Sequence, residues 1–219
     1  MHQTVQNLIN IKDNIKSNLP NQKNQKLPKI IAVSKTFGID KILPLIEYGH
    51  FDFGENKVQE AIKKWSELKL SNNKIKLHLI GGLQTNKVKL AVKLFDYIHS
   101  VDSEKLAKKI SVEQQKQKKK VRIFIQVNIG NESQKSGISV KDLPSFFNYC
   151  SIENKLNVIG LMVLPPQDKK DNYFLKMQNL SNSLNLRELS MGMSSDYLDA
   201  LNYGATYVRI GSSIFGSRN

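Results

Sequence analysis

Lys29-Ile-Ile-Ala-Val-Ser-Lys-Thr36 is the stretch that decides the fold. Its apolar run, residues 30–33, is short, rich in β-branched residues and free of polar alternation, which is typical of a strand buried on both faces in a parallel sheet. Lys35 follows this run and is expected at the carboxyl end of the strand, where parallel α/β proteins bind their ligands. A lysine that is merely the first solvated residue after a strand is the alternative.

The same unit, a short apolar strand followed by a turn and a helical segment, recurs along the chain. Further strands are predicted at residues 50–54, 76–80, 96–100, 121–127, 157–162, 187–191 and 206–210. Helices are predicted at residues 40–48, 56–69, 85–95, 102–117, 139–151, 171–184 and 195–203, and a short turn or helix is predicted after residue 210. With the first strand, this gives eight strands in alternation with helices, which is the number that closes an α/β (β/α)8 TIM barrel. An open doubly wound sheet is the alternative and fits the count less well.

The N-terminal residues 1–28 precede the repeated units. Apolar residues at helical intervals predict an amphipathic helix that Pro20 closes, and a polar linker follows it. No interdomain linker interrupts the chain, so residues 1–219 are expected to form a single domain.

The composition indicates a cytoplasmic protein. The chain has 219 residues, of which 40% are hydrophobic, and no apolar run approaches the length that crosses a bilayer. The N-terminus lacks the pattern of a signal peptide. The single cysteine, Cys150, has no partner for an internal disulfide, as expected in a reducing compartment. We therefore expect no membrane association.

The formal charge of +14 raises the possibility of a nucleic-acid-binding barrel. Only four of the 33 basic residues are arginines, however, and the densest cluster, residues 116–120, falls in a predicted loop. The excess therefore reflects a general use of lysine, and we expect no specific nucleic-acid partner.

Two loops of the predicted barrel have the chemistry of a phosphate site. Ser190-Met-Gly-Met-Ser194 and Arg209-Ile-Gly-Ser-Ser213 follow the seventh and eighth strands, between which barrels often hold phosphate. Glycine permits close approach of the backbone, and hydroxyls and N–H groups at helix starts donate to phosphate oxygens. Arg209 offers a planar cation at a strand end, although a structural salt bridge would explain it equally well. His78 and His99 are expected either in the core or behind the residues that line the site, and no metal site is predicted.

The chain resembles the pyridoxal phosphate homeostasis proteins over about residues 30–218. The matching stretches, in order, are Ala32-Val-Ser-Lys-Thr36, Phe53-Gly-Glu-Asn-Lys-Val-Gln-Glu60, His78-Leu-Ile-Gly-Gly-Leu-Gln-Thr-Asn-Lys87, His99-Ser-Val-Asp-Ser103, Gln126-Val-Asn128, Lys135-Ser-Gly137, Gly160-Leu-Met162, Leu189-Ser-Met-Gly-Met-Ser-Ser-Asp196 and Val208-Arg-Ile-Gly-Ser-Ser-Ile-Phe-Gly216. The sequence departs from the family pattern at Gly82, where a bulkier residue is common, and at Ser213, where alanine is usual. The segment 166–189 is short for the family.

The resemblance implies a barrel similar to the N-terminal barrel of alanine racemase, with pyridoxal 5′-phosphate as its cofactor. By that likeness, Lys35 holds the cofactor as a Schiff base and Arg209 faces the pyridine nitrogen. The other residues that the resemblance implies are Ser194, Gly211 and Ser212 for the phosphate, Gly192 and Ile210 for backbone contacts, and Asn56 and Met162 for the ring pocket.

The function implied is intracellular homeostasis of pyridoxal phosphate, by carriage or buffering, in a monomeric protein that passes the cofactor to apo-forms of pyridoxal phosphate enzymes. An arginine beside the ring nitrogen makes the cofactor a weak electron sink. The second domain that supplies a tyrosine base in racemases is not expected after Asn219. A binding protein is therefore favoured over an enzyme. A pyridoxal phosphate enzyme with weak racemase-like activity is the main alternative, and a Schiff-base aldolase is a further one.

Overall fold

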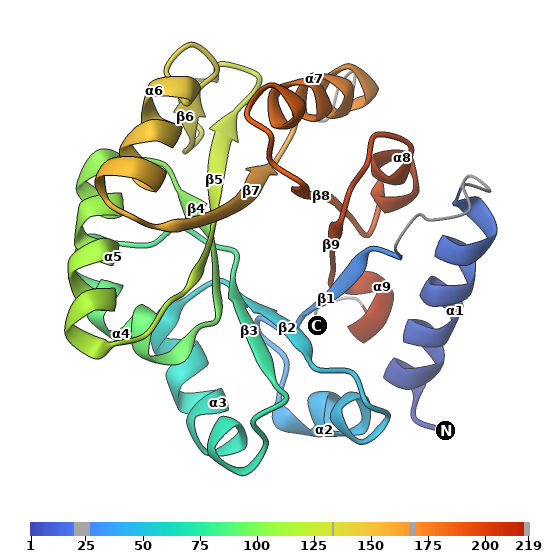
Figure 1. Ribbon diagram of the computed structural model, residues 1–219. Helices are drawn as coiled ribbons and strands as arrows, with labels where there is room; N and C mark the ends of the chain where they lie inside the picture. Colours follow the sequence, from blue (N-terminus) through green and yellow to red (C-terminus); the bar gives the residue numbers. More distant parts are fainter. Residues whose placement is uncertain (20–26, 133, 167–169, 217–219) are drawn as a thin grey trace.

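The computed structural model describes residues 1–19, 27–132, 134–166 and 170–216. Within these residues, parallel strands form one sheet, and pairing of β4 with β5 closes it into a barrel. Figure 1 shows the ring of strands enclosed by helices. The barrel strands are β1 (Lys29–Val33), β2 (Asp52–Glu55), β3 (Lys76–Leu79), β4 (Tyr97–Val101), β5 (Arg122–Asn128), β7 (Asn157–Val163), β8 (Glu188–Met193) and β9 (Tyr207–Ile210).

The closed sheet confirms the predicted (β/α)8 barrel and excludes the open doubly wound sheet. β1 lies between β2 and β9, since Ala32 is in register with both Phe53 and Ile210. One further strand, β6 (Ile138–Ser139), adds two residues beside the end of β5 and takes no part in the closure. All carboxyl ends of the barrel strands therefore meet at one mouth.

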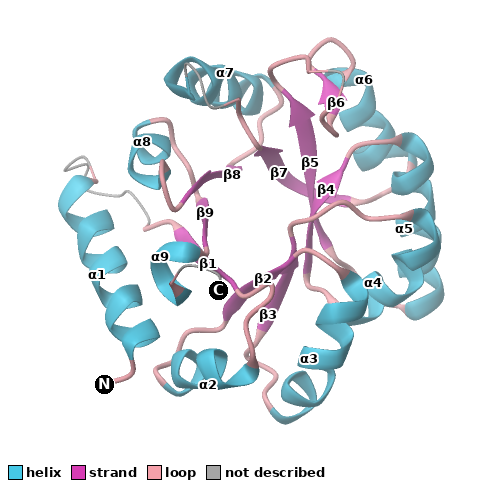
Figure 2. Ribbon diagram, turned by 180° about the vertical axis from the view of Figure 1, so that it is seen from behind, coloured by secondary structure: helices cyan, strands magenta, loops and turns pink. Residues whose placement is uncertain are grey.

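Helices cover the outside of the barrel (Figure 2). They are α1 (Gln3–Asn18), α2 (Ile39–Glu47), α3 (Val58–Ser71), α4 (Val88–Leu94), α5 (Glu104–Gln117), α6 (Leu143–Asn148), α7 (Lys170–Ser183), α8 (Tyr197–Asn202) and α9 (Ser212–Phe215). The prediction placed these helices correctly, with two local differences. A 3₁₀ turn, Thr85–Lys87, precedes α4, and the predicted helix 139–151 starts later and ends in a π-helical turn, Tyr149–Glu153. No helix of the described residues is long and apolar enough to cross a membrane.

The alternation of side chains along β1 explains its continuous apolar sequence. Ile30 and Ala32 belong to the large core between the sheet and the helices, where Trp65 is fully buried. Ile31 points the other way, into a second cluster inside the barrel, together with Tyr97, Phe124, Met162 and Tyr207. Both faces of the strand are therefore buried, as its lack of polar alternation predicted.

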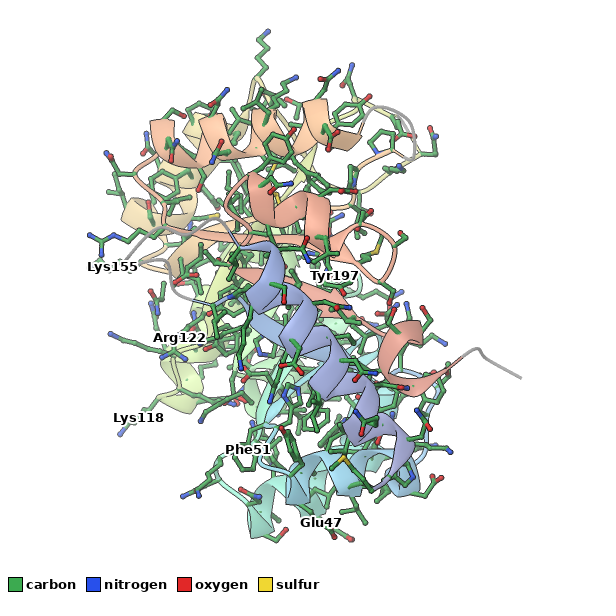
Figure 3. All side chains as sticks on the ribbon, turned by 90° about the vertical axis from the view of Figure 1, so that its right-hand side faces the viewer. Glu47, Phe51, Lys118, Arg122, Lys155 and Tyr197 are labelled. Carbon is green, nitrogen blue, oxygen red and sulfur yellow. The ribbon has the colours of Figure 1, made fainter. Side chains whose placement is uncertain are left out.

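The N-terminal helix α1 packs along the outside of the barrel (Figure 3). The side-chain amide of Asn7 donates a hydrogen bond of 2.9 Å to the carbonyl of Ile214 in α9. The predicted helix is thus confirmed, and it ties the start of the chain to the element that follows the last strand. Pro20 and residues 21–26 of the predicted linker lie outside the described residues.

Candidate functional site

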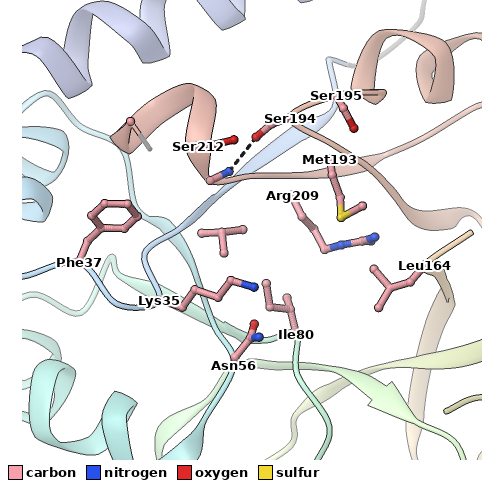
Figure 4. A pocket seen from close by; sticks show the side chains of 13 residues that line it. Lys35, Phe37, Asn56, Ile80, Leu164, Met193, Ser194, Ser195, Arg209 and Ser212 are labelled. Atoms are coloured by element: carbon pink, nitrogen blue, oxygen red, sulfur yellow. Dashed lines mark hydrogen bonds between the residues drawn. The ribbon is translucent and has the colours of Figure 1, made fainter. Parts of the chain in front are cut away.

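A cavity of about 370 Å³ opens at the mouth of the barrel, in the size range of small-molecule sites. Figure 4 shows the side chains of Lys35, Asn56 and Arg209 converging on it. The lining residues come from the ends of six strands and the segments that follow them: Val33, Lys35, Phe37, Asn56, Ile80, Leu164, Met193, Ser194, Ser195, Arg209, Gly211, Ser212 and Gly216. The cavity therefore combines apolar walls with an amine, a guanidinium and several hydroxyls.

A tight turn directly after β1 presents Lys35 to the cavity. The amide of Phe37 donates to the carbonyl of Ser34 at 3.1 Å, so Lys35 and Thr36 are the central residues of this turn. Thr36 has a φ of 71°, a value that type II turns require at this position but that a β-branched residue rarely adopts. The backbone thus carries strain beside Lys35, the one lysine among the described residues that line this cavity.

A buried carboxylate, Glu55, holds the ends of β1 and β2 together. Its Oε1 accepts hydrogen bonds from Ser34 Oγ at 2.8 Å, Lys64 Nζ at 2.9 Å and Trp65 Nε1 at 2.9 Å. Glu55 is fully buried, and Lys64 supplies the opposite charge that its burial requires. Because Ser34 precedes Lys35 and Glu55 precedes Asn56, this network fixes two of the cavity residues. The sequence gave no sign of these partners of Glu55.

Arg209 is held rigidly below the opening of the cavity. Its Nη1 donates to Ser190 Oγ at 2.7 Å, and its Nη2 donates to the carbonyl of Val163 at 2.8 Å. Burial lowers the pKa of Arg209 to about 10, against the opposing charge of Asp196. The guanidinium therefore remains a cation at neutral pH and offers donors only.

Hydroxyls and backbone amides gather at the opposite side of the cavity. Ser194 Oγ accepts from the amides of Gly211 at 3.3 Å and Ser213 at 3.4 Å, and the first of these bonds is drawn in Figure 4. The hydroxyls of Ser195 and Ser212 line the same part of the cavity. An anion with several oxygen acceptors would find donors here, which is the chemistry of a phosphate site.

The structure brings six of the nine predicted site residues onto this cavity: Lys35, Asn56, Ser194, Arg209, Gly211 and Ser212. Met162 lies in the cluster inside the barrel, and Ile210 lies in the outer core beside β1. Gly192 has a φ of 87° and approaches Tyr197, where a Cβ would lie 2.9 Å from the Tyr197 Cα. It lies near the end of β8 and is not among the described residues that line the cavity.

Several lining residues were not predicted, chiefly Phe37, Ile80, Leu164, Met193 and Ser195. Ile80 and Leu164 directly follow β3 and β7, so their positions at strand ends were the available signal. Met193 and Ser195 flank Ser194 in a loop already assigned to the site. The apolar members supply flat walls against which a ring can pack.

A second cavity of about 340 Å³ adjoins the first and shares Asn56, Ile80 and Leu164 with it. Gly82 lies on its wall, and a Cβ there would meet nothing within 4 Å. The departure from the family pattern at Gly82 thus leaves this side open. Ser213 contributes its amide to Ser194, as described above. Residues 167–169 of the short 166–189 segment lie outside the described residues.

Across residues 1–19, 27–132, 134–166 and 170–216, no group of three or more His, Cys, Asp or Glu side chains converges as a metal would require. His78 and His99 are fully buried, which confirms their expected place in the core.

Fold and site together define a class of protein: a single (β/α)8 barrel whose mouth brings a lysine, a buried arginine and hydroxyl-bearing loops to one cavity. The matches to known sequences narrow this class. The chain belongs to the pyridoxal phosphate homeostasis protein family, and the wider family described as "Alanine racemase, N-terminal domain" matches residues 7–219.

Relatives and solved structures support this assignment. The pyridoxal phosphate homeostasis protein of Haemophilus influenzae is 36% identical over 208 residues, covering 90% of this chain and 88% of its own. That of Aquifex aeolicus is 38% identical over 200 residues, covering 87% of each chain. The structure of PipY from Synechococcus elongatus with PLP bound superposes with a TM-score of 0.84 at 32% identity, covering 98% of this chain and 100% of its own.

More distant structures share the fold alone. An alanine racemase of Clostridium difficile is 16% identical with a TM-score of 0.74, and the match covers 99% of this chain but 57% of the racemase. The predicted likeness to the alanine racemase barrel is therefore confirmed at the level of the fold.

Proposed function

We propose that this protein binds pyridoxal 5′-phosphate at the barrel mouth and holds it as a Schiff base on Lys35. The observation that carries the proposal is the convergence of Lys35, Arg209 and the Ser194 and Ser212 hydroxyls on one cavity of about 370 Å³. The related PipY, whose structure contains PLP, adds independent support.

The residues present fit the parts of this cofactor. A primary amine is the partner of an aldehyde, and Lys35 is the lysine that lines the cavity. The hydroxyls of Ser194 and Ser212 and the amide of Gly211 suit the phosphate. Asn56 and the apolar walls suit the ring, and Gly192 and Ile210 support the phosphate loops through their backbone. Met162 underlies the site from inside the barrel.

Arg209 determines what the bound cofactor is able to do. Pyridoxal phosphate supplies an electrophilic aldehyde and an electron-accepting ring. A guanidinium offers donors and no acceptor, so Arg209 leaves the ring nitrogen unprotonated and the ring a weak electron acceptor. This arrangement favours retention of the cofactor over turnover of amino acids.

We infer that the biological role is homeostasis of pyridoxal phosphate through carriage or buffering. The names of the relatives support this role. Transfer to apo-forms of pyridoxal phosphate enzymes, a monomeric state and a cytoplasmic location remain predictions of this proposal.

A weak racemase-like activity is the second candidate, because the cavity that adjoins the cofactor site leaves space for an amino acid beside the ring. A two-base racemase needs a proton donor opposite the lysine, and no tyrosine is among the described residues that line either cavity. Racemisation of a panel of amino acids at rates above those of free cofactor would favour this candidate.

The visible spectrum tests the proposal. Purified protein mixed with pyridoxal phosphate is expected to show the yellow band of a protonated imine, and Lys35→Ala is expected to lose it. Lys57→Ala is the matched control, because it removes an exposed lysine next to Asn56 that forms a surface ion pair with Glu60. A visible band of the same intensity in Lys35→Ala would refute Lys35 as the residue that binds the cofactor.

A further inference from the structure

A chain of hydrogen bonds joins five polar side chains across the inside of the barrel. Asp52 Oδ1 lies 3.0 Å from His78 Nε2, and His78 Nδ1 lies 3.0 Å from His99 Nε2. His99 Nδ1 lies 2.9 Å from Ser190 Oγ, which accepts from Arg209 Nη1 at 2.7 Å. His78, His99 and Ser190 are fully buried. The members come from five strands, so the chain depends on the closed barrel.

The two ends of this chain lie at opposite ends of the barrel. Asp52 is the first residue of β2 and its side chain is 26% exposed. It lines a small cavity of about 170 Å³ with Lys12 and His50. Arg209 lies near the carboxyl end of β9 and lines the mouth cavity. The chain thus links the amino end of the barrel to the proposed cofactor site.

The direction of every bond follows from the two end groups. A guanidinium only donates and an ionised carboxylate only accepts. Burial lowers the pKa of His78 and holds that of His99 well below its ordinary value, so both imidazoles are neutral at pH 7. Arg209 then donates to Ser190, Ser190 to His99 Nδ1, His99 Nε2 to His78 Nδ1, and His78 Nε2 to Asp52. Both histidines carry their proton on Nε2, and no other assignment satisfies the whole chain.

Stacked rings hold the two imidazoles in place. His78 stacks on Tyr97 with centroids 4.1 Å apart and an interplanar angle of 10°. His99 stacks on Phe124 at 4.2 Å and 18°. Because neither ring can turn without losing this packing, the hydrogen bonds between the imidazoles have a fixed geometry.

Other charged groups also face the chain and set its electrostatic background. Near its amino end are Lys29 and His50, which act on the pKa of Asp52, and Asp96, which acts on that of His78. At its other end, Asp196 acts on the pKa of Arg209. Asp52 is the carboxylate that is hydrogen-bonded directly to His78.

We propose that Asp52 is a positioning residue for Arg209 and acts on it through His78, His99 and Ser190. The Asp52 carboxylate fixes the donor-to-acceptor direction of every hydrogen bond in the chain. This direction orients the Ser190 hydroxyl, which accepts from Arg209 Nη1. The carboxylate also places a negative charge at the end of the chain opposite to Arg209. A residue at the amino end of the barrel thereby sets the orientation of the hydroxyl that accepts from the cation at the mouth. The effect of Asp52 on a bound cofactor rests on the proposed function, whereas the chain of hydrogen bonds does not.

The first test uses the protein without cofactor. Nitrogen-15 chemical shifts of the histidine rings at about pH 7 are expected to show His78 and His99 neutral and protonated on Nε2. Asp52→Ala removes the terminal acceptor and is expected to change the tautomer of His99, two hydrogen bonds away. Ser111→Ala is the control, because its buried hydroxyl donates to the Asn154 carbonyl at 2.7 Å outside the chain. A protonated Nδ1 on wild-type His99, or an unchanged His99 tautomer in folded Asp52→Ala, would overturn the proposal.

The second test uses protein loaded with pyridoxal phosphate and follows the visible band against pH. Asp52→Asn removes the charge but keeps an oxygen acceptor for His78, so the histidine tautomers should persist in this variant. It can be measured even if Asp52→Ala fails to fold. Loss of the negative charge disfavours a cationic imine, so the midpoint is expected to move to lower pH. A midpoint equal to that of wild type and Ser111→Ala would contradict the proposal. If the wild type takes up no cofactor, the proposed function fails. The histidine tautomers still test the chain of hydrogen bonds in that case.

Discussion

Acid is expected to destabilise this fold well above the pH at which ordinary carboxylates titrate, because three histidines are buried. His50, His78 and His99 are 7%, 0% and 0% exposed. Burial lowers the pKa of His50 to about 4, partly opposed by Asp52. Burial also lowers the pKa of His78, and it lowers that of His99 further with the help of His78 and Arg209. The folded protein therefore resists protonation that the unfolded chain accepts.

The sign and size of the effect follow from this difference. Below the unfolded pKa of 6.5, the unfolded chain binds more protons than the folded chain, so the free energy of unfolding falls as the pH falls. The shift of His50 alone corresponds to ~3 kcal/mol. His50 alone gives a slope of up to ~1.4 kcal/mol per pH unit, and the lowered pKa values of His78 and His99 act in the same direction. Asp102 acts in the opposite direction, because burial raises its pKa.

Urea unfolding followed by the fluorescence of Trp65, the single tryptophan, measures this slope. Wild type is compared with His50→Gln between about pH 7.5 and about pH 5. The slope of the free energy of unfolding against pH is expected to be smaller in the variant by up to ~1.4 kcal/mol per pH unit, which is the contribution of one histidine. A free energy of unfolding that does not change between these pH values, or an identical slope in the variant, would refute the reasoning.

Three substitutions near the site give further predictions. Glu55→Ala leaves Lys64 without its buried partner and should lower the free energy of unfolding by ~3–5 kcal/mol in urea titrations, with weaker uptake of pyridoxal phosphate. Gly192→Ala should cost ~2 kcal/mol or more, because φ is 87° and the new Cβ meets Tyr197; a neutral result would contradict this contact. Thr36→Asn should raise the thermal midpoint through ~0.5–1 kcal/mol of relieved strain.

The barrel was predictable because parallel strands buried on both faces leave a strong signal. Ile30, Ile31 and Ala32 are apolar in succession because they alternate between the outer core and the barrel interior. The same signal recurs in the other strands, and its number of repeats indicated closure. The two-residue strand β6 and the π-helical turn were missed, since each depends on local packing with no periodic pattern.

The site was predictable only to the level of strand ends. Side chains alternate along a strand, so Arg209 points into the barrel while Ile210 points into the outer core. Met162 points inward but lies too deep, and Leu164, two residues later on the same side, reaches the cavity. The alternation of side chains and the depth of each position in the barrel distinguish the residues that line the cavity from those that do not.

The links between distant residues could not be read from the sequence. The bond between His99 and Ser190 joins β4 to β8 across the barrel, and Glu55 accepts hydrogen bonds from Ser34, which follows β1, and from Trp65 in α3. Such contacts depend on strand register and on which side chains meet inside the closed sheet, and no local pattern encodes either. The sequence therefore identified the histidines as core residues without showing their connection to the site.

Borohydride reduction tests the central claim most directly. Protein loaded with pyridoxal phosphate is reduced, digested and analysed by mass spectrometry to locate the lysine that carries the pyridoxyl group. The account predicts a single dominant modification, on the peptide that contains Lys35, and its loss in Lys35→Ala with Lys57→Ala unaffected. Modification only on another lysine, with Lys35 unlabelled, would contradict it.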